Sequence, residues 1–146
     1  AVINRYEDVP IKGIAYVRGF GLKEGAIASS VAHDSHNVIV VGCSDTAMAE
    51  AANLVINAKG GVSAVSADDA HLLELSVAGI MSSEDGFEVA HKYEAIDAFV
   101  KETLGSKLSA PFMTLSFMAL LVIPEIKLSD KGLFDGRNFH FMAPCN

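Results

Sequence analysis

The chain has 146 residues, the usual size of one domain, and combines 51% hydrophobic residues with only 20% charged ones. Its formal net charge is −7 and its basic residues do not cluster, which excludes nucleic acid as a partner. The longest near-continuous apolar stretch, residues 111–124, is too short to cross a bilayer, which takes about 20 residues, so a membrane is excluded as well. The mean hydropathy of +0.34 therefore predicts a large contact with another protein or domain.

The first third of the chain predicts three strands separated by two connections. Residues 11–20 alternate loosely between apolar and polar side chains, residues 26–32 are apolar and small, and residues 38–41 are β-branched. The glycines Gly19, Gly21 and Gly25 indicate a tight turn, because the third comes one residue too late for a dinucleotide-binding loop. The second connection is a polar run from His33 to Asn37, held between two apolar strands.

The middle of the chain predicts two helices and a hairpin. Ser44 or Asp45 caps a helix that runs to about residue 59 and stops at the glycines that follow. Residues 62–66 and 72–77 are expected to form an antiparallel hairpin around a turn at 68–70. A second helix starts at residues 82–85 and ends at Gly105. The positions expected to be buried are Met48, Ala51, Ala52, Val55 and Ile56 on the first helix and Val89, Tyr93, Ile96, Val100 and Leu104 on the second.

The last part of the chain ends in a predicted edge strand. Residues 133–134 are apolar, and residues 138–142 alternate. No repeat, low-complexity segment or linker divides the sequence. The order of elements predicts an α+β fold: a single domain over residues 1–146, with a mixed or antiparallel sheet and two main helices packed on it.

One polar run carries the chemistry that the sequence offers, and its members are His33, Asp34, Ser35, His36 and Asn37. Imidazoles beside a carboxylate are typical of a metal site or of a contact with a purine edge, and in a turn the two histidines can converge. The alternative is a structural turn in which Asp34 and Asn37 satisfy backbone donors and the histidines have no chemical role. The other histidines stand singly, so a closed four-ligand zinc site is not expected, and His33 and His36 remain the candidate metal ligands.

The two cysteines, Cys43 and Cys145, do not make a disulfide framework. One disulfide between them is an open alternative, but the reduced state and a cytoplasmic location are favoured. The charged residues at the start of the sequence lack the apolar core of a signal peptide, which agrees with that location. Cys43 lies between a predicted strand and a predicted helix, and we expect it to be a small buried core residue and not a reactive thiol.

Three blocks of the sequence resemble the C-terminal domain of the adenine deaminase family. The first is GFGLKEGAIASSVAHDSHNVIVVG at residues 19–42, the second is PFMTLSFMALLVIPEIKLSDKGL at 111–133, and the third is VAGIMS at 77–82. The likeness covers about residues 10–135. Residues 43–46 and Leu121 depart from the family pattern, and neither departure touches the polar run.

The resemblance implies a metal-dependent hydrolase that converts adenine and water to hypoxanthine and ammonia in purine salvage. In that family Mn or Fe activates the water, and the metal ligands lie on a (β/α) barrel upstream of this domain. A barrel of about 250 residues does not fit in this chain, so the chain alone is expected to be inactive. The expected partners are the barrel domain, a small-molecule purine and further copies of the chain in a homo-oligomer. The alternative is a stand-alone purine-binding or oligomerisation module without catalysis.

Overall fold

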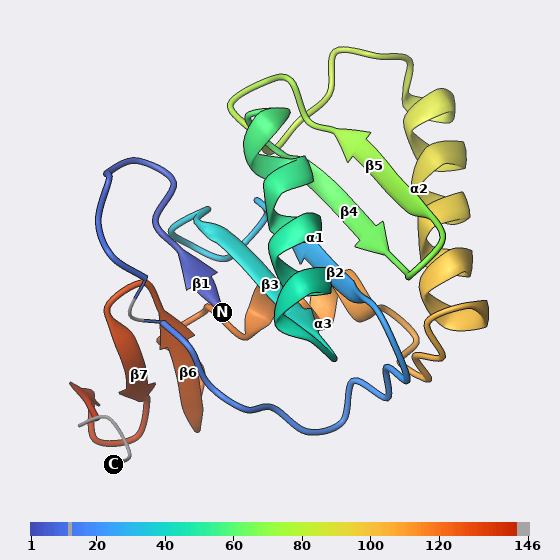
Figure 1. Ribbon diagram of the computed structural model, residues 1–146. Coiled ribbons are helices and arrows are strands. Elements are labelled where there is room, and N and C mark those ends of the chain that lie inside the picture. The colour runs from blue at the N-terminus through green and yellow to red at the C-terminus, as the bar shows by residue number, and fades with distance from the viewer. Residues whose placement is uncertain (12, 143–146) are drawn as a thin grey trace.

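The computed structural model of the chain describes residues 1–11 and 13–142. The elements are the strands β1 (Val2–Ile3), β2 (Ala26–Ser29), β3 (Val38–Gly42), β4 (Gly61–Val65), β5 (Ala70–Glu74), β6 (Ile126–Ser129), β7 (Gly132–Asp135) and β8 (His140–Phe141), and the helices α1 (Asp45–Asn57), α2 (Gly86–Glu102) and α3 (Pro111–Phe117). They form one α+β domain, as the sequence predicts (Figure 1). The expected mixed or antiparallel sheet is antiparallel in every strand pair of the described residues.

The main sheet has five strands in the order β1-β3-β2-β4-β5. Its centre is the pair β2 and β3, in which Ser29 lies opposite Ile39. On the other side of β2, Ser29 lies opposite Val62 of β4. Because neighbouring strands run in opposite directions, the end of β2 and the starts of β3 and β4 share one edge of the sheet. The polar run that follows β2 is thereby placed at this edge.

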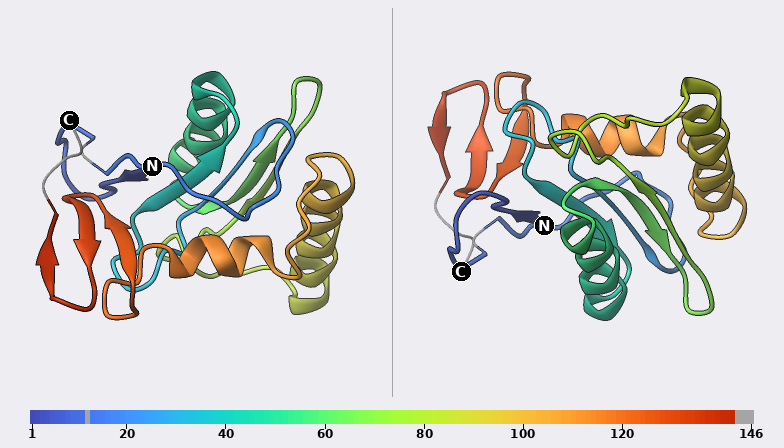
Figure 2. Two further views of the ribbon diagram at one scale, coloured as in Figure 1. Left: turned by 90° about the horizontal axis from the view of Figure 1, so that it is seen from below. Right: turned by 90° about the horizontal axis from the view of Figure 1, so that it is seen from above.

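Each face of the main sheet is covered by helix, which gives three layers (Figure 2). Successive side chains of a strand point to opposite faces, so β2 and β3 contribute to two separate cores. Ala28 and Val40 pack with Val55 of α1 on one face. Ile27 and Ile39 lie in the second core, on the face of α2 and α3. The second core also contains Ala64, Leu73, Ile96, Val100, Leu104, Phe112 and Leu115.

The two main helices begin where the sequence predicts a cap. The Ser44 side chain accepts a hydrogen bond from the backbone N–H of Ala47, which satisfies one of the free donors in the first turn of α1. Asp85 does the same for the backbone N–H of Phe87 at the start of α2. Of the positions expected to be buried, Met48, Val89 and Tyr93 are only half-buried, and Ile56 is 44% exposed.

The predicted strand over residues 11–20 is wrong. Of its described residues only Gly13 pairs, in an isolated bridge with Val2, and the rest of the segment follows no regular structure. The reason is that β1, at the very start of the chain, takes the edge of β3. Gly13 is then wedged between β1 and the second sheet, where a Cβ would stand 2.1 Å from the carbonyl oxygen of Ser129.

Helix α3 and the hairpin of β6 and β7 are absent from the sequence prediction. Pro111 starts α3, as proline does at a first helical position, and Phe112 and Leu115 are buried against the main sheet. The apolar run 111–124 shows no alternation of apolar and polar residues with the period of a helix, because the exposed side of α3 also carries the apolar side chains of Met113 and Phe117. In the second sheet, with the order β6-β7-β8, the edge strand predicted over residues 138–142 is confirmed only at His140–Phe141, which form β8.

The prediction of a buried Cys43 is also wrong, because the cysteine is exposed. The residue lies in the short connection between the end of β3 at Gly42 and the cap of α1 at Ser44. Its backbone N–H donates to the carbonyl of Gly25, and its Sγ lies 3.5 Å from the carbonyl oxygen of Leu22. Cys145, the partner in the alternative disulfide, lies outside the described residues.

Candidate functional site

The polar run forms a tight turn between β2 and β3, which both sequence interpretations of the run allow. The backbone N–H of His36 donates to the carbonyl oxygen of Ala32 at 2.7 Å, and His36 has a positive φ of 52°. Asp34 and Ser35 are exposed at the tip of the turn, whereas Asn37 is 3% exposed. The turn therefore holds one polar side chain inside the protein and presents two to the outside.

The turn brings the two histidines together. The ring centroids of His33 and His36 are 6.1 Å apart, with an angle of 73° between the planes. The His33 ring also lies 5.2 Å from the ring of Phe117 at the end of α3. The Nδ1 atom of His36 is buried and has no hydrogen-bond partner within the described part of the chain. A buried polar atom without a partner is rare and costly, so this nitrogen needs an explanation.

Helix α3 fixes the turn from one side. The backbone N–H of His33 donates to the carbonyl oxygen of Ser116 at 3.3 Å. Ser116 is itself buried, and its Oγ finds no partner in residues 1–11 and 13–142. Two buried polar atoms without partners, His36 Nδ1 and Ser116 Oγ, thus belong to the turn and to the helix that supports it.

The N-terminal segment holds the other side of the turn. The backbone N–H of Arg5 donates to Oδ1 of Asn37 at 3.1 Å, and the hydroxyl of Tyr6 donates to the carbonyl oxygen of Ser35 at 2.9 Å. The side chain of Asn37 thus accepts from a backbone N–H, as the structural interpretation of the turn predicts, but the donor lies in a distant segment and not in the turn. Arg5 and Tyr6 were not singled out from the sequence, because nothing local indicates a bond that spans about 30 residues.

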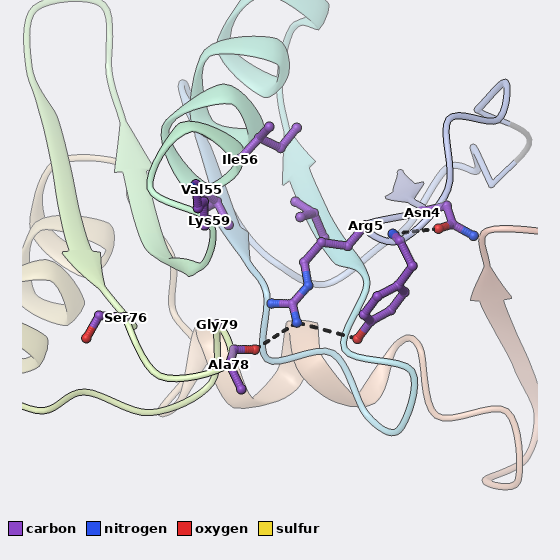
Figure 3. Close-up of a pocket in the computed structure, with 10 residues that line it drawn as sticks. Asn4, Arg5, Val55, Ile56, Lys59, Ser76, Ala78 and Gly79 are labelled. Atoms are coloured by element: carbon purple, nitrogen blue, oxygen red, sulfur yellow. Dashed lines mark hydrogen bonds between the residues drawn. The ribbon is translucent and has the colours of Figure 1, made fainter.

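Beside Tyr6 lies a hollow of about 520 Å³ that contains the Arg5 side chain (Figure 3). Nη2 of Arg5 donates to the carbonyl oxygen of Ala78 at 2.8 Å, and the guanidinium carbon lies 5.2 Å from the centroid of the Tyr6 ring. Arg5 therefore joins the N-terminal segment to the loop after β5. Lys59, two residues after the end of α1, lines the same hollow.

A buried serine ties that loop to the sheet. Ser30 is fully buried, and its hydroxyl donates to the carbonyl oxygen of Gly79 at 2.5 Å while it accepts from the backbone N–H of Gly61 at 2.8 Å. Gly79 also lies against Gly60, where a Cβ would stand 2.2 Å from the Cα of Gly79. All three sequence blocks thus meet at this edge of the sheet: the turn from the first, α3 from the second and the Gly79 loop from the third.

The described residues do not form a metal site of their own. No place in residues 1–11 and 13–142 brings three histidine, cysteine, aspartate or glutamate side chains together. His33 and His36 supply two imidazoles, but the exposed Asp34 does not join them into a cluster of three. A protein metal site usually has at least three protein ligands, so the two histidines would need a further ligand from outside the described residues to hold an ion.

Comparison with known proteins identifies the family. The family model described as adenine deaminase C-terminal domain matches residues 1–140. The chain belongs to this family. It is 64% identical over 144 residues to an adenine deaminase of Sulfurovum sp. (strain NBC37-1), a match that covers 99% of this chain and 27% of that protein. The adenine deaminase of Salinibacter ruber is 54% identical over 142 residues, which are 97% of this chain and 26% of that protein.

The chain spans about a quarter of the length of the curated relatives it matches. The adenine deaminase of Methanosarcina acetivorans gives the same picture, with 51% identity over 97% of this chain and 25% of that protein. None of the helices in the described ranges has the length and apolar character of a membrane span. The resemblance that the three blocks indicate is therefore confirmed for the domain.

Proposed function

We propose that this domain is the C-terminal part of an adenine deaminase that converts adenine and water to hypoxanthine and ammonia in the cytoplasm. The observation that carries the proposal is the family match over residues 1–140, together with the names of the relatives. The relatives are about four times as long as the chain, which leaves room for a barrel domain upstream. A Mn or Fe ion would be held there, and it would supply the activated water.

The proposed role of this domain is to complete or brace the active site, with the turn at its mouth. The residues proposed to face it are His33, Asp34, Ser35, His36 and Asn37. Neutral imidazole offers one donor and one acceptor, which suits a purine edge, and Phe117 beside His33 adds an aromatic surface of which 37% is exposed. The unpartnered Nδ1 of His36 supports this role, because a group from outside the described residues would satisfy it.

The apolar residues between β1 and β2 support a contact with other protein. Five of them are exposed, and one of these, Tyr16, is fully exposed: Val9, Ile11, Ile14, Tyr16 and Val17. They follow one another in a single segment, and exposed apolar surface marks interaction sites. The proposed partners are the upstream barrel and further copies of the enzyme in a homo-oligomer. Light scattering tests the second partner: a mass of one chain at every concentration, for this domain and for the full-length enzyme, would contradict it.

Activity assays on divided protein test the proposed function. We expect hypoxanthine formation by the full-length enzyme loaded with Mn or Fe, and none by this chain under the same conditions. The upstream part alone should have low activity, and adding this chain should raise it if the domain completes the site. Turnover by this chain alone contradicts the proposal. Adenine binding to the chain together with an inactive full-length protein would instead favour a purine-binding module without catalysis.

A further inference from the structure

The edge of β3 is only partly covered. Strand β1 consists of two residues and pairs Val2 with Ile39 and Ile3 with Val38. The α-amino group of Ala1 continues the ladder by one step, since it donates to the carbonyl oxygen of Val40 at 2.7 Å, and the N–H of Val40 donates to the carbonyl oxygen of Ala1 at 2.9 Å. Strand β3 goes on for two residues beyond this pair, to Gly42.

The alternation of an antiparallel ladder tells which way the groups of Gly42 point. Along β3, every second residue bonds to the same neighbour. Val40 bonds toward β1, and Cys43 bonds toward β2 through its N–H and the carbonyl of Gly25. Gly42 therefore faces the side of β1, and its pairing with Ala26 of β2 is of the type without hydrogen bonds. Its N–H and carbonyl oxygen have no hydrogen-bond partner among residues 1–11 and 13–142, and they lie one ladder step beyond Ala1.

The environment of Ala1 suits a peptide group better than a charged amine. Burial lowers the pKa of the Ala1 α-amino group from 8.0 to about 6, because the charged form loses its hydration there. A peptide N–H at the same position donates the same bond to Val40 and carries no charge to desolvate.

We infer that in proteins that carry this domain the residues preceding Ala1 extend β1 along β3, so that the second residue before Ala1 pairs with Gly42. The occupant of this edge is the upstream chain itself, since the relatives are about four times as long as this chain. The extended strand leads directly into Arg5 and Tyr6, which bond to the turn at Asn37 and Ser35. It therefore links the upstream part to the candidate site by one continuous backbone. This inference does not depend on the proposed activity.

Hydrogen exchange at Gly42 tests the inference. The probe is this chain extended by the four residues encoded upstream of it, compared with the chain acetylated at Ala1. We expect the amide of Gly42 to exchange at least about tenfold more slowly in the extended chain, because its N–H gains a carbonyl partner. An unchanged exchange rate overturns the inference.

Two proline variants of the extension give the matched control. Proline at the second position before Ala1 places its ring where an N–H would donate to Gly42, and should abolish the protection. Proline immediately before Ala1 removes an N–H that points away from β3, and should leave the protection in place. Equal effects of the two variants contradict the assigned register. Protection that appears only with concentration, together with a doubled mass in light scattering, would assign the edge to a second copy and overturn the upstream occupant.

Discussion

The sheet edge around the His33–Asn37 turn differs from residues 9–11 and 13–17 in how the side chains find partners. At the edge that carries the turn, Ser30, Gly60 and Gly79 interlock, and the N-terminal segment bonds across to the turn. Between β1 and β2 the chain instead turns apolar side chains such as Tyr16 outward. The first region is closed by groups of this chain, whereas the second leaves apolar side chains exposed. The backbone is therefore held most firmly at the sheet edge that carries the candidate site.

The largest effect is expected at the interlocked glycines. Gly60→Ala places a Cβ 2.2 Å from the Cα of Gly79 at a φ of 142°, so backbone must move, and we expect a loss of more than about 3 kcal/mol in the free energy of unfolding. Gly19→Ala is the control, since its φ of 96° is also positive but nothing lies within 4 Å, and strain alone should cost about 1 kcal/mol. If urea unfolding gave the same loss of unfolding free energy for Gly60→Ala and Gly19→Ala, the close packing of Gly60 on Gly79 would not be rigid.

The buried hydroxyl of Ser30 comes next. Ser30→Ala leaves the buried N–H of Gly61 without its acceptor, which should cost about 2–3 kcal/mol in the free energy of unfolding. Ser63→Ala is a matched control in the same sheet: Ser63 is also fully buried, but it donates to the carbonyl of Ala51, which keeps its helical donor in α1. The control should cost about 1 kcal/mol. A smaller loss for Ser30 than for Ser63 contradicts the account of this edge.

The pH dependence of stability tests the start of β1. Burial lowers the pKa of the Ala1 amine to about 6 in the folded chain, from an ordinary value of 8.0 that applies to the unfolded chain. Between pH 6 and pH 8 the unfolded chain therefore binds more protons than the folded chain. Stability should therefore fall as pH is lowered from 8 to 6, by about 2 kcal/mol. Acetylation of Ala1 removes this group, and the difference between the free and the acetylated chain isolates it from the histidines. If the free energy of unfolding changed with pH in the same way in both chains, the buried Ala1 amine would not be the source of the pH dependence.

The smallest effect on stability is expected in the outward segment. Tyr16→Ser should change the free energy of unfolding of this chain by less than about 0.5 kcal/mol, because the side chain is fully exposed. The same substitution should weaken binding of this chain to the separately produced upstream part, which a titration between the two parts would measure. If the variant destabilises the isolated chain as much as a core substitution such as Ile27→Ala, the segment packs on this domain and is not a partner surface.

The elements with a local pattern could be predicted from the sequence. The runs of small and β-branched residues predict β2 and β3, because strands buried on both faces are apolar along their whole length. Ser44 predicts the start of α1, because its side chain caps the first turn. The same reasoning failed for residues 11–20, whose alternation is that of a strand. Alternation does not say whether a sheet edge is free, and β1 already holds that edge.

The candidate site could be predicted in part. The turn itself followed from its composition, and its two histidines converge as a turn allows. The contacts of Arg5 with Asn37 and of Ser30 with Gly79 could not be predicted, because they join segments far apart in the sequence without any pattern in between. Phe117 lies in the second block of the family resemblance, which was the one signal that could have drawn attention to it.

The central claim is that the His33–Asn37 turn serves the reaction and not the fold alone. It is tested most directly by His33→Asn and His36→Asn, made separately in the full-length enzyme, with kcat/KM and Tm measured together. We predict a loss of about 2–4 kcal/mol of transition-state stabilisation in kcat/KM with Tm nearly unchanged, as for removal of a well-placed catalytic donor. Full kcat/KM in both variants with a lowered Tm would contradict the claim and leave the turn a structural brace.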